Sequence, residues 1–230
     1  MIYHAALNKK IRDEIVPFLR KCRRLYAGTE TTLKYIRDQI SKVGQQTKTL
    51  EELKVNLIEI IDDYITNRII MAQEVLINYG LSILSDKKEE VILTFGNQES
   101  YSVEEILKGA HKAGKKIRVI VVDSSPEFHG RGVVKRLSNH GIQCTYTLIS
   151  MVNFFINQVT KVFLPSTYIL CNGALVAPIG SSMIGCIAYT HHIPVVAVCE
   201  TYKFEDRVNL DQINNNEQGS KQKFTQNYLR

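Results

Sequence analysis

A dense group of polar side chains follows the apolar run 194–199. Residues 200–203 are Glu-Thr-Tyr-Lys, which bring together a carboxylate, two hydroxyls and an ammonium group. The apolar run predicts a buried strand. In open parallel sheets, ligands and partners bind in the crevice outside the carboxyl ends of the strands. We therefore predict that Glu200 and Lys203 belong to a binding site for a ligand or a partner.

Two further loops follow predicted strands and are expected at the same edge of the sheet. The first begins at Asp123, which would act as a base or cap the next turn, and the cap is the commoner role. The second carries the turn Asn172-Gly173 and leads to Ser181. Ser181 opens a predicted helix whose free amides can hold a phosphate, although Gly-Ser is also an ordinary helix start. The pocket or partner-binding residues predicted on these grounds are Asp123, Asn172, Gly173, Ser181, Glu200 and Lys203.

The sequence lacks the motifs that hold nucleotides, metals or covalent intermediates. A Gly-Arg-Gly run at 130–132 is followed by Lys135 where a dinucleotide fingerprint needs its third glycine, and no Walker A lysine follows a glycine loop. His191 and His192 are adjacent and have no ligand partner one turn away. Cys199 lies in an apolar run that is typical of a core cysteine. We predict no catalytic residue, no metal and no cofactor.

Composition favours an intracellular protein. The chain has 230 residues, enough for one large domain or two unequal ones. Its five cysteines form no Cys-x-x-Cys pair, which argues against a disulfide scaffold or a zinc site. No apolar run approaches the ~20 residues of a membrane span, and the N-terminus has no signal-peptide core. We therefore predict a cytoplasmic location and no membrane partner.

The net charge of +6 is concentrated in the first 50 residues, which hold eleven Lys or Arg and four Asp or Glu. A basic region can meet RNA or an acidic protein surface, and it is also what a solvated helical face looks like. The sequence has no aromatic RNA-recognition pattern, no zinc-finger spacing and no helix-turn-helix signature. RNA is therefore not an expected partner.

Residues 1–88 are predicted to form a helical domain. Apolar residues at 33–43 recur at helical spacing, and Gly44 is predicted to end that helix. A capping box at 49–52 begins the next helix. An apolar period of four residues, with one slip, then continues over 53–79 and predicts a helix of roughly 50 Å.

Residues 89–230 are predicted to form an α/β domain. Short apolar runs at 91–95, 117–122 and 194–199 are typical of strands, and helical patterns lie between the predicted strands. This alternation predicts a Rossmann-like, mostly parallel sheet with helices on both faces. The tail from about residue 211 is polar and low in complexity, and is predicted to be a loop or disordered.

Three strand-end motifs carry a resemblance to a known family. They read Val-Ile-Val-Val-Asp-Ser-Ser-Pro-Glu-Phe-His-Gly-Arg at 119–131, Asn-Gly-Ala-Leu-Val at 172–176 and Cys-Glu-Thr-Tyr-Lys-Phe at 199–204. On these motifs the chain resembles the alpha/beta/delta regulatory family of translation initiation factor 2B. Within that family the run 200–208 is most similar to delta subunits, and the resemblance covers about residues 15–208.

The same fold serves sugar-phosphate isomerases, of the methylthioribose-1-phosphate and ribose-1,5-bisphosphate kinds. These enzymes resemble one another in a catalytic cysteine after the first α/β strand, whereas residues 94–98 contain none here. Thr167 stands where the resemblance places their catalytic aspartate. A threonine cannot carry the proton transfers of a carboxylate at pH 7. Thr167 is therefore expected only as a pocket residue, and isomerase activity is not expected.

The resemblance implies a non-catalytic regulatory subunit of the guanine-nucleotide exchange factor for translation initiation factor 2, one that senses phosphorylation of that factor's alpha subunit. The implied partners are factor 2 itself and the other subunits of factor 2B, the beta subunit first and also alpha, gamma and epsilon. Arg23, Arg24 and Arg37 are the candidate docking residues for factor 2, although surface ion pairs are the ordinary role of such arginines. The alternative function is that of a divergent sugar-phosphate isomerase, or of a sensor that binds a sugar phosphate at the strand ends.

Overall fold

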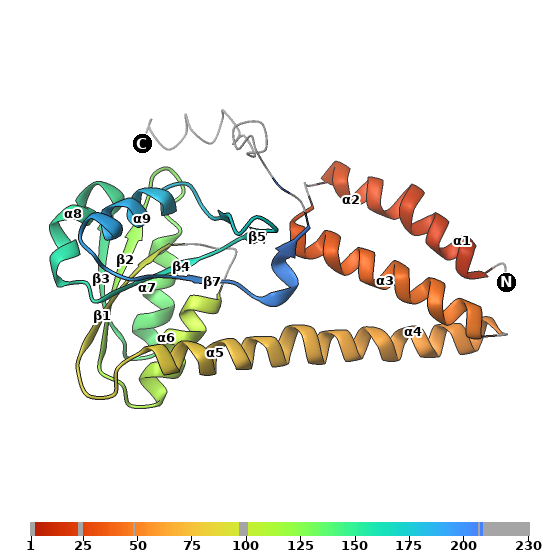
Figure 1. Cartoon of the computed structure of the whole chain (residues 1–230), viewed down its shortest axis with the longest axis horizontal. Coiled ribbons are helices and arrows are strands. Elements are labelled where there is room, and N and C mark those ends of the chain that lie inside the picture. The colour runs from red at the N-terminus through yellow and green to blue at the C-terminus, as the bar shows by residue number, and fades with distance from the viewer. Residues whose placement is uncertain (1–2, 23–24, 48, 97–100, 207, 209–230) are drawn as a thin grey trace. The chain divides into compact units, whose positions relative to one another are not determined.

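The computed structural model describes residues 3–22, 25–47, 49–96, 101–206 and 208 (Figure 1). The polar tail predicted from about residue 211 lies outside these residues. The chain divides into two compact units. We call residues up to Val75 together with Glu200–Glu205 the helical unit, and Leu76–Cys199 the sheet unit.

The division falls after Val75, whereas the sequence predicts a domain boundary after residue 88. The reason is local packing at the end of the long helix. Leu76, Ile77, Leu81 and Ile83 are partly buried against the core of the sheet unit. Helical periodicity continues through this stretch and therefore does not reveal where its packing partner changes.

The helical unit begins with two helices that are joined by a short π-helical segment. Its elements are α1 (Tyr3–Lys10), the π-helical segment η1 (Ile11–Ile15), α2 (Val16–Cys22), α3 (Ala27–Gln46) and α4 (Leu50–Tyr64). A second π-helical segment, η2 (Ile65–Ile70), joins α4 to α5 (Met71–Ile83), which continues into the sheet unit. The apolar period of about four residues predicted here is longer than the 3.6 residues of an α-helical turn, and a π turn is wider than an α-helical one.

Gly44 lies within α3 and does not end it, contrary to the prediction from sequence. A β-carbon at this position would come within 2.2 Å of His4 Cβ on α1. Nearby, the Asn8 side-chain amide donates to Ser41 Oγ at 2.9 Å. Gly44 therefore allows α1 to lie close against α3.

The start of α4 agrees with the predicted capping box. Thr49 accepts from the Glu52 amide, and the Glu52 carboxylate accepts from the Thr49 amide. Inside the unit, the Tyr64 hydroxyl lies 3.0 Å from Thr32 Oγ1, and its ring lies 4.8 Å from that of Tyr35. These contacts fix the face of α4 that packs on α3.

The sheet unit has the Rossmann-like architecture predicted from the sequence. Its elements are β1 (Glu90–Phe95), α6 (Ser102–Lys112), β2 (Ile117–Asp123), α7 (Gly130–Asn139), β3 (Gln143–Leu148), η3 (Ile149–Met151), α8 (Val152–Phe155), η4 (Ile156–Gln158), β4 (Lys161–Pro165), β5 (Tyr168–Leu170), β6 (Leu175–Val176), α9 (Ser181–Thr190) and β7 (Val195–Val198). The described strands of the main sheet follow the order β3-β2-β1-β4-β7, and every pair is parallel. Strands β5 and β6 form a separate antiparallel hairpin.

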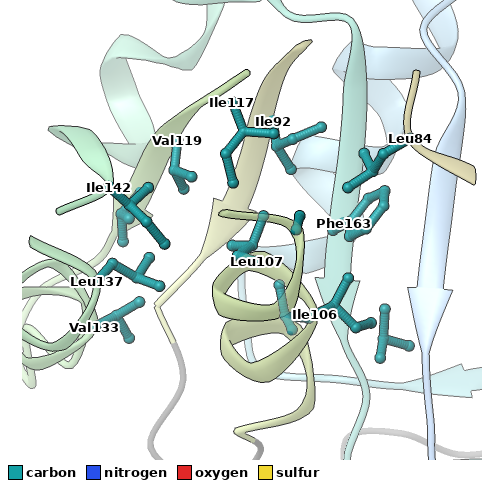
Figure 2. Packing of buried hydrophobic residues seen from close by; sticks show 14 residues of the cluster. Leu84, Ile92, Ile106, Leu107, Ile117, Val119, Val133, Leu137, Ile142 and Phe163 are labelled. Carbon is teal, nitrogen blue, oxygen red and sulfur yellow. The ribbon is translucent and has the colours of Figure 1, made fainter. Parts of the chain in front are cut away.

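Helices cover both faces of this sheet, as Figure 1 shows, and alternate strand residues supply the two cores. On one face α6 and α7 pack over Ile92, Val119 and Phe163 (Figure 2). On the other face α8 and α9 pack over residues that include Leu93 and Val122. Central strands buried on both sides explain the continuous apolar runs in the sequence.

The last strand of the sheet, β7, differs from the buried strand expected over 194–199. Only Val198 in it is fully buried, and Val195 is 42% exposed. Within the described sheet β7 pairs with β4 alone and therefore forms an edge. An apolar composition predicted the strand but not its position at the edge.

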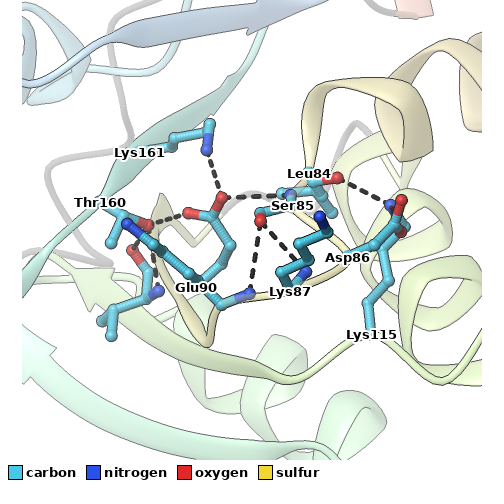
Figure 3. A network of polar contacts seen from close by, with 10 residues as sticks. Leu84, Ser85, Asp86, Lys87, Glu90, Lys115, Thr160 and Lys161 are labelled. Carbon is cyan, nitrogen blue, oxygen red and sulfur yellow. Dashed lines mark hydrogen bonds and ion pairs between the residues drawn. The ribbon is translucent and has the colours of Figure 1, made fainter.

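A buried carboxylate at the amino end of β1 ties β1 to β4. Glu90 accepts hydrogen bonds from the Lys161 ammonium, the Thr160 hydroxyl and the Ser85 amide (Figure 3). Burial of Glu90 opposes its ionisation, but these three donors outweigh that effect, so that the pKa of Glu90 lies below its ordinary value of 4.5. Glu90 is therefore ionised in the folded protein at neutral pH.

We expect Glu90→Gln to reduce the stability of the fold at neutral pH and to have less effect in acid. A carboxyl with a lowered pKa stabilises the folded state above its unfolded pKa, and this stabilisation disappears as the pH falls through the folded pKa. The free energy of unfolding, measured by denaturant titration from pH 7 to pH 3, should therefore converge for the two proteins below about pH 4.5. A constant difference over this range would contradict the lowered pKa of Glu90 in the folded protein.

Candidate functional site at the carboxyl ends of the strands

Asp123 ends β2 and is fixed by its surroundings. Its side chain is 2% exposed, it accepts from the Ser124 amide at 2.8 Å, and its second oxygen accepts from the Tyr146 hydroxyl at 3.0 Å. Both donors hold the carboxylate in one orientation. Asp123 thus links the ends of β2 and β3.

Tyr146 and Arg131 complete this group, and neither was singled out by sequence reasoning. The pKa of Tyr146 is raised because burial and the neighbouring Asp123 carboxylate disfavour the phenolate, although Arg131 acts in the opposite direction. The Arg131 guanidinium also lies 4.6 Å from the centre of the Phe128 ring. Tyr146 therefore remains a neutral hydrogen-bond donor, which suits a structural or binding role.

Two glycines allow the loops of this edge to touch. A β-carbon on Gly96, which follows β1, would lie 2.4 Å from the Gly130 Cα at the start of α7. A β-carbon on Gly130 would lie 2.8 Å from the Asp123 carboxylate carbon. The backbone after β1, the start of α7 and the Asp123 side chain are therefore in mutual contact. No spacing motif in the sequence indicates this contact, because it joins three separate segments.

Thr167, Asn172 and Gly173 belong to the chain that leaves β4. The Thr167 amide donates to the Val176 carbonyl at 2.8 Å, which closes the β5–β6 hairpin. The Asn172 side chain accepts from the Ala174 amide at 3.1 Å, and Gly173 has a φ of +80°, a conformation that favours glycine. The predicted turn at Asn172-Gly173 is therefore present, and both of its residues are exposed.

Ser181 is the first residue of α9 and is 4% exposed. Its hydroxyl is buried and has no hydrogen-bond partner among the described residues. Gly180 precedes it with a φ of +110°, and a β-carbon there would come within 2.6 Å of Ile149. The helix start is thus closely packed against η3, and the Ser181 hydroxyl is its one unusual polar group.

The crevice between β1 and β4, where open α/β sheets reverse their strand order, is filled by side chains. Thr94, Phe95, Glu104 and Pro165 are among the residues around a space of about 10 Å³. That volume is what a single water needs. Glu104 in this wall is held by Arg136 through two hydrogen bonds of 2.8 and 2.7 Å. Among the described residues, this crevice is therefore a closely packed part of the fold.

Glu200 and Lys203, which the sequence predicts to lie at this edge, belong to the helical unit. They form an ion pair of 2.7 Å within the short helix η5 (Thr201–Lys203). The Tyr202 ring is the nearest neighbour of Gly28 at the start of α3, and Phe204 accepts from Thr31 at 3.5 Å. The structure therefore brings Asp123 together with Tyr146, but it places Glu200 and Lys203 against α3.

The structure describes only one of the three candidate docking residues for factor 2. Arg23 and Arg24 lie outside the described residues. Arg37 is half-buried on α3, where its carbonyl accepts from Asn8 at 3.4 Å. Its positive charge helps to lower the pKa of Asp13, whose largest influence is the hydrogen bond from Arg12. The side-chain Nε of Arg37 is buried and has no hydrogen-bond partner among the described residues.

The described residues contain no group of three or more His, Cys, Asp or Glu side chains placed to hold a metal ion. In the same part of the chain, no helix is both long and apolar enough to cross a membrane. Asp123, Tyr146 and Arg131 form hydrogen-bonding and charged groups on a rigid edge. Such an arrangement is suited to binding.

Comparisons with known proteins agree with the resemblance seen in the strand-end motifs. A protein of Schizosaccharomyces pombe (strain 972) called translation initiation factor eIF2B subunit delta is 37% identical over 218 residues, which is 94% of this chain and 46% of that protein. A ribose 1,5-bisphosphate isomerase of Archaeoglobus fulgidus is 38% identical over 102 residues, which is 44% of this chain and 33% of the enzyme. This chain thus spans less than half the length of either relative.

A solved structure is similar over most of the chain. It is the tetrameric eIF2B beta2-delta2 complex from C. thermophilum, to which the chain is similar with a TM-score of 0.79 and 27% identity, over 86% of this chain and 63% of that one. The sequence model of the initiation factor 2 subunit family matches residues 3–228. Because that match covers almost the whole sequence, the chain belongs to the initiation factor 2 subunit family.

Proposed function

We propose that this chain acts as a non-catalytic, delta-type regulatory subunit of the guanine-nucleotide exchange factor for translation initiation factor 2. The observation that carries the proposal is the similarity to two delta subunits, which extends over 94% and 98% of this chain, whereas the matches to three ribose 1,5-bisphosphate isomerases cover 44%, 68% and 71%. The close packing of the crevice at the strand ends also favours a role that does not need a substrate pocket there. The site of action is the cytoplasm, where translation initiation takes place.

The partner for which the geometry gives most support is a beta subunit. The related solved structure contains beta and delta subunits in a tetramer. In this chain the β5–β6 hairpin presents Asn172 and Gly173 on an exposed turn. We propose that this turn contacts the beta subunit, and that Glu200 and Lys203 take part in pairing indirectly by holding η5 on α3 within the helical unit.

The wider assembly follows from the same proposal. The alpha, gamma and epsilon subunits would join the beta–delta pair, and the assembly would bind factor 2 with a preference for its phosphorylated alpha subunit. Phosphorylated factor 2 can shift the subunits toward one of two arrangements only if it binds that arrangement more tightly. The size of this difference in affinity sets how far exchange activity can change. The basic helical unit, with Arg23, Arg24 and Arg37, is the proposed docking surface.

Co-expression with the beta subunit of the same organism tests this function. We expect the two chains to elute together from a size-exclusion column, and the assembled factor to bind phosphorylated factor 2 more tightly than the unphosphorylated form. The variant Asn172→Arg should weaken the affinity for beta by about tenfold or more, since a buried, unpaired charge is costly at an interface.

Asn157→Arg is the matched control, because Asn157 is also an exposed asparagine of the sheet unit but lies in η4. Its affinity for beta should be that of the unaltered chain. Recovery of the chain alone, or only with itself, would reject the regulatory function. That outcome would favour the second candidate, a sugar-phosphate sensor or divergent isomerase, which the unpartnered Ser181 hydroxyl at the start of α9 supports.

A further inference from the structure

One face of α4 carries large apolar side chains that the helical unit leaves in solvent. We define the α4 stripe as Val55, Ile58 and Ile61 of α4 together with Ile65, the first residue of η2. These four residues are 55%, 59%, 38% and 42% exposed. Their spacing of three, three and four residues places them on one side of the helix. Single exposed apolar residues are ordinary on a protein surface, whereas a contiguous row of them marks an interaction site.

The stripe is distinct from the packed face of the same helix. Leu53 and Tyr64 are the buried residues of α4, and Tyr64 reaches Thr32 on α3. In Figure 1, α3 lies between α1–α2 on one side and α4 on the other. The periodicity in the sequence assigns Ile61 and Ile65 to the same face as Leu53, but the structure leaves both of them more than a third exposed. Helix α4 therefore has one apolar face packed on α3 and a second one that is open.

Acidic residues surround the open face. Residues 50–65 hold five Asp or Glu and one Lys, a net charge of −4 in a chain whose overall charge is +6. Asp62 follows Ile58 by four residues and Glu59 follows Val55 by four, so that each carboxylate borders the stripe. Both carboxylates are exposed. This is the reverse of the basic character of the first 50 residues.

These two observations exclude one simple occupant. If two copies of the chain met through the same stripe, their acidic borders would face each other, and like charges at an interface cost binding energy. A partner helix with its own apolar row and with lysine or arginine beside it would instead match both features. Helices recognise apolar helix faces through anchors at spacings of three and four residues.

We propose that the α4 stripe is a docking site for a basic amphipathic helix of another protein. Val55, Ile58, Ile61 and Ile65 supply the apolar contact. Glu59, Asp62 and Asp63 select lysine- or arginine-rich partners over acidic ones. This site uses no residue of the strand-end edge and is independent of the regulatory function proposed above.

Two designed peptides test the site on the whole chain. Both carry leucines at spacings of three and four over five turns; one has lysines beside the leucines and the other has glutamates. By fluorescence anisotropy at low salt, we expect the lysine peptide to bind at least tenfold more tightly than the glutamate peptide. The double variant Asp62→Lys, Asp63→Lys should reverse that preference, and added salt should weaken binding of the lysine peptide.

Ile58→Ser should weaken binding of the lysine peptide at least tenfold, because it removes a central apolar contact. Phe18→Ser is the matched control, since Phe18 is 65% exposed on α2, and its binding should be unchanged. Equal binding of the two peptides, or no effect of Ile58→Ser, would overturn the proposal. Sedimentation that shows a dimer of the unaltered chain and a monomer of Ile58→Ser would also overturn it, because the occupant would then be a second copy.

Discussion

Replacement of Arg136 by methionine should lower the free energy of unfolding by about 3 kcal/mol, because it leaves a buried carboxylate without its partner. The Glu104 side chain is 4% exposed and receives both hydrogen bonds of the Arg136 guanidinium, at 2.8 and 2.7 Å. The same hydrogen bonds raise the pKa of Arg136. Methionine retains the apolar stem of arginine, so that the change isolates the loss of the charge.

Thermal unfolding of the whole chain measures this effect, and the expected decrease in Tm is about 6–12 °C. Arg118→Met is the matched control, because its partner Glu89, at 3.2 Å, has a side chain that is 53% exposed. The carboxylate that this change leaves behind stays in contact with water, so stability should change by less than about 1 kcal/mol. The double variant Glu104→Gln, Arg136→Met should recover part of the loss, since no buried charge then remains. A decrease for Arg136→Met no larger than that for Arg118→Met would show that Glu104 is solvated in solution.

The fold could be predicted from the sequence because its signals are local. Continuous apolar runs such as Ile117–Val122 indicate strands that are covered on both faces, and alternation with helices indicates a parallel sheet. The Thr49–Glu52 capping box also depends on residues close in sequence, and it is present. Each of these features is determined within about a dozen residues.

The features that could not be predicted depend on contacts between distant segments. Gly44 reads as a helix stop, yet its role is set by His4, forty residues earlier. Ile61 and Ile65 share an apolar period with Leu53, but the position of α3 decides which of them is buried. Periodicity identifies apolar faces and does not say how many of them the chain itself covers.

The strand-end edge shows the same limit. Asp123 could be picked out because it ends an apolar run, and the structure places it in a hydrogen-bonded group. Its partner Tyr146 could not, because Tyr146 lies within a strand of mixed polarity and becomes a partner only through the β2–β3 register. Glu200 and Lys203 follow a strand as expected, but the next few residues pack on α3. A residue that follows a strand can therefore be predicted as a candidate site residue, but its position after the strand does not determine which residues surround it.

The substitution Gly96→Ala should also destabilise the sheet unit by about 3 kcal/mol, at the upper end of the usual cost of overpacking. The new β-carbon would lie 2.4 Å from the Cα and 2.5 Å from the amide nitrogen of Gly130. Both are backbone atoms, and no side-chain rotation relieves the clash. The end of β1 and the start of α7 would have to separate, and this would loosen the packing of Gly130 against Asp123. Denaturant titration measures the loss of stability. The Ser124 amide donates a hydrogen bond to the Asp123 carboxylate, so its rate of hydrogen exchange reports whether the edge opens.

Gly185→Ala provides the contrast, because it adds the same methyl group where nothing lies within 4 Å. Gly185 lies inside α9, so alanine should leave stability unchanged or raise it by up to about 1 kcal/mol through its higher helix propensity. Comparison of the two variants therefore separates the effect of losing a glycine on stability from the effect of the steric clash at Gly96. If Gly96→Ala were tolerated as well as Gly185→Ala, the close contact between β1 and α7 would not exist in solution. A destabilised Gly96→Ala variant with an unchanged affinity for the beta subunit would instead place the pairing surface away from Asp123, on the exposed hairpin turn at Asn172.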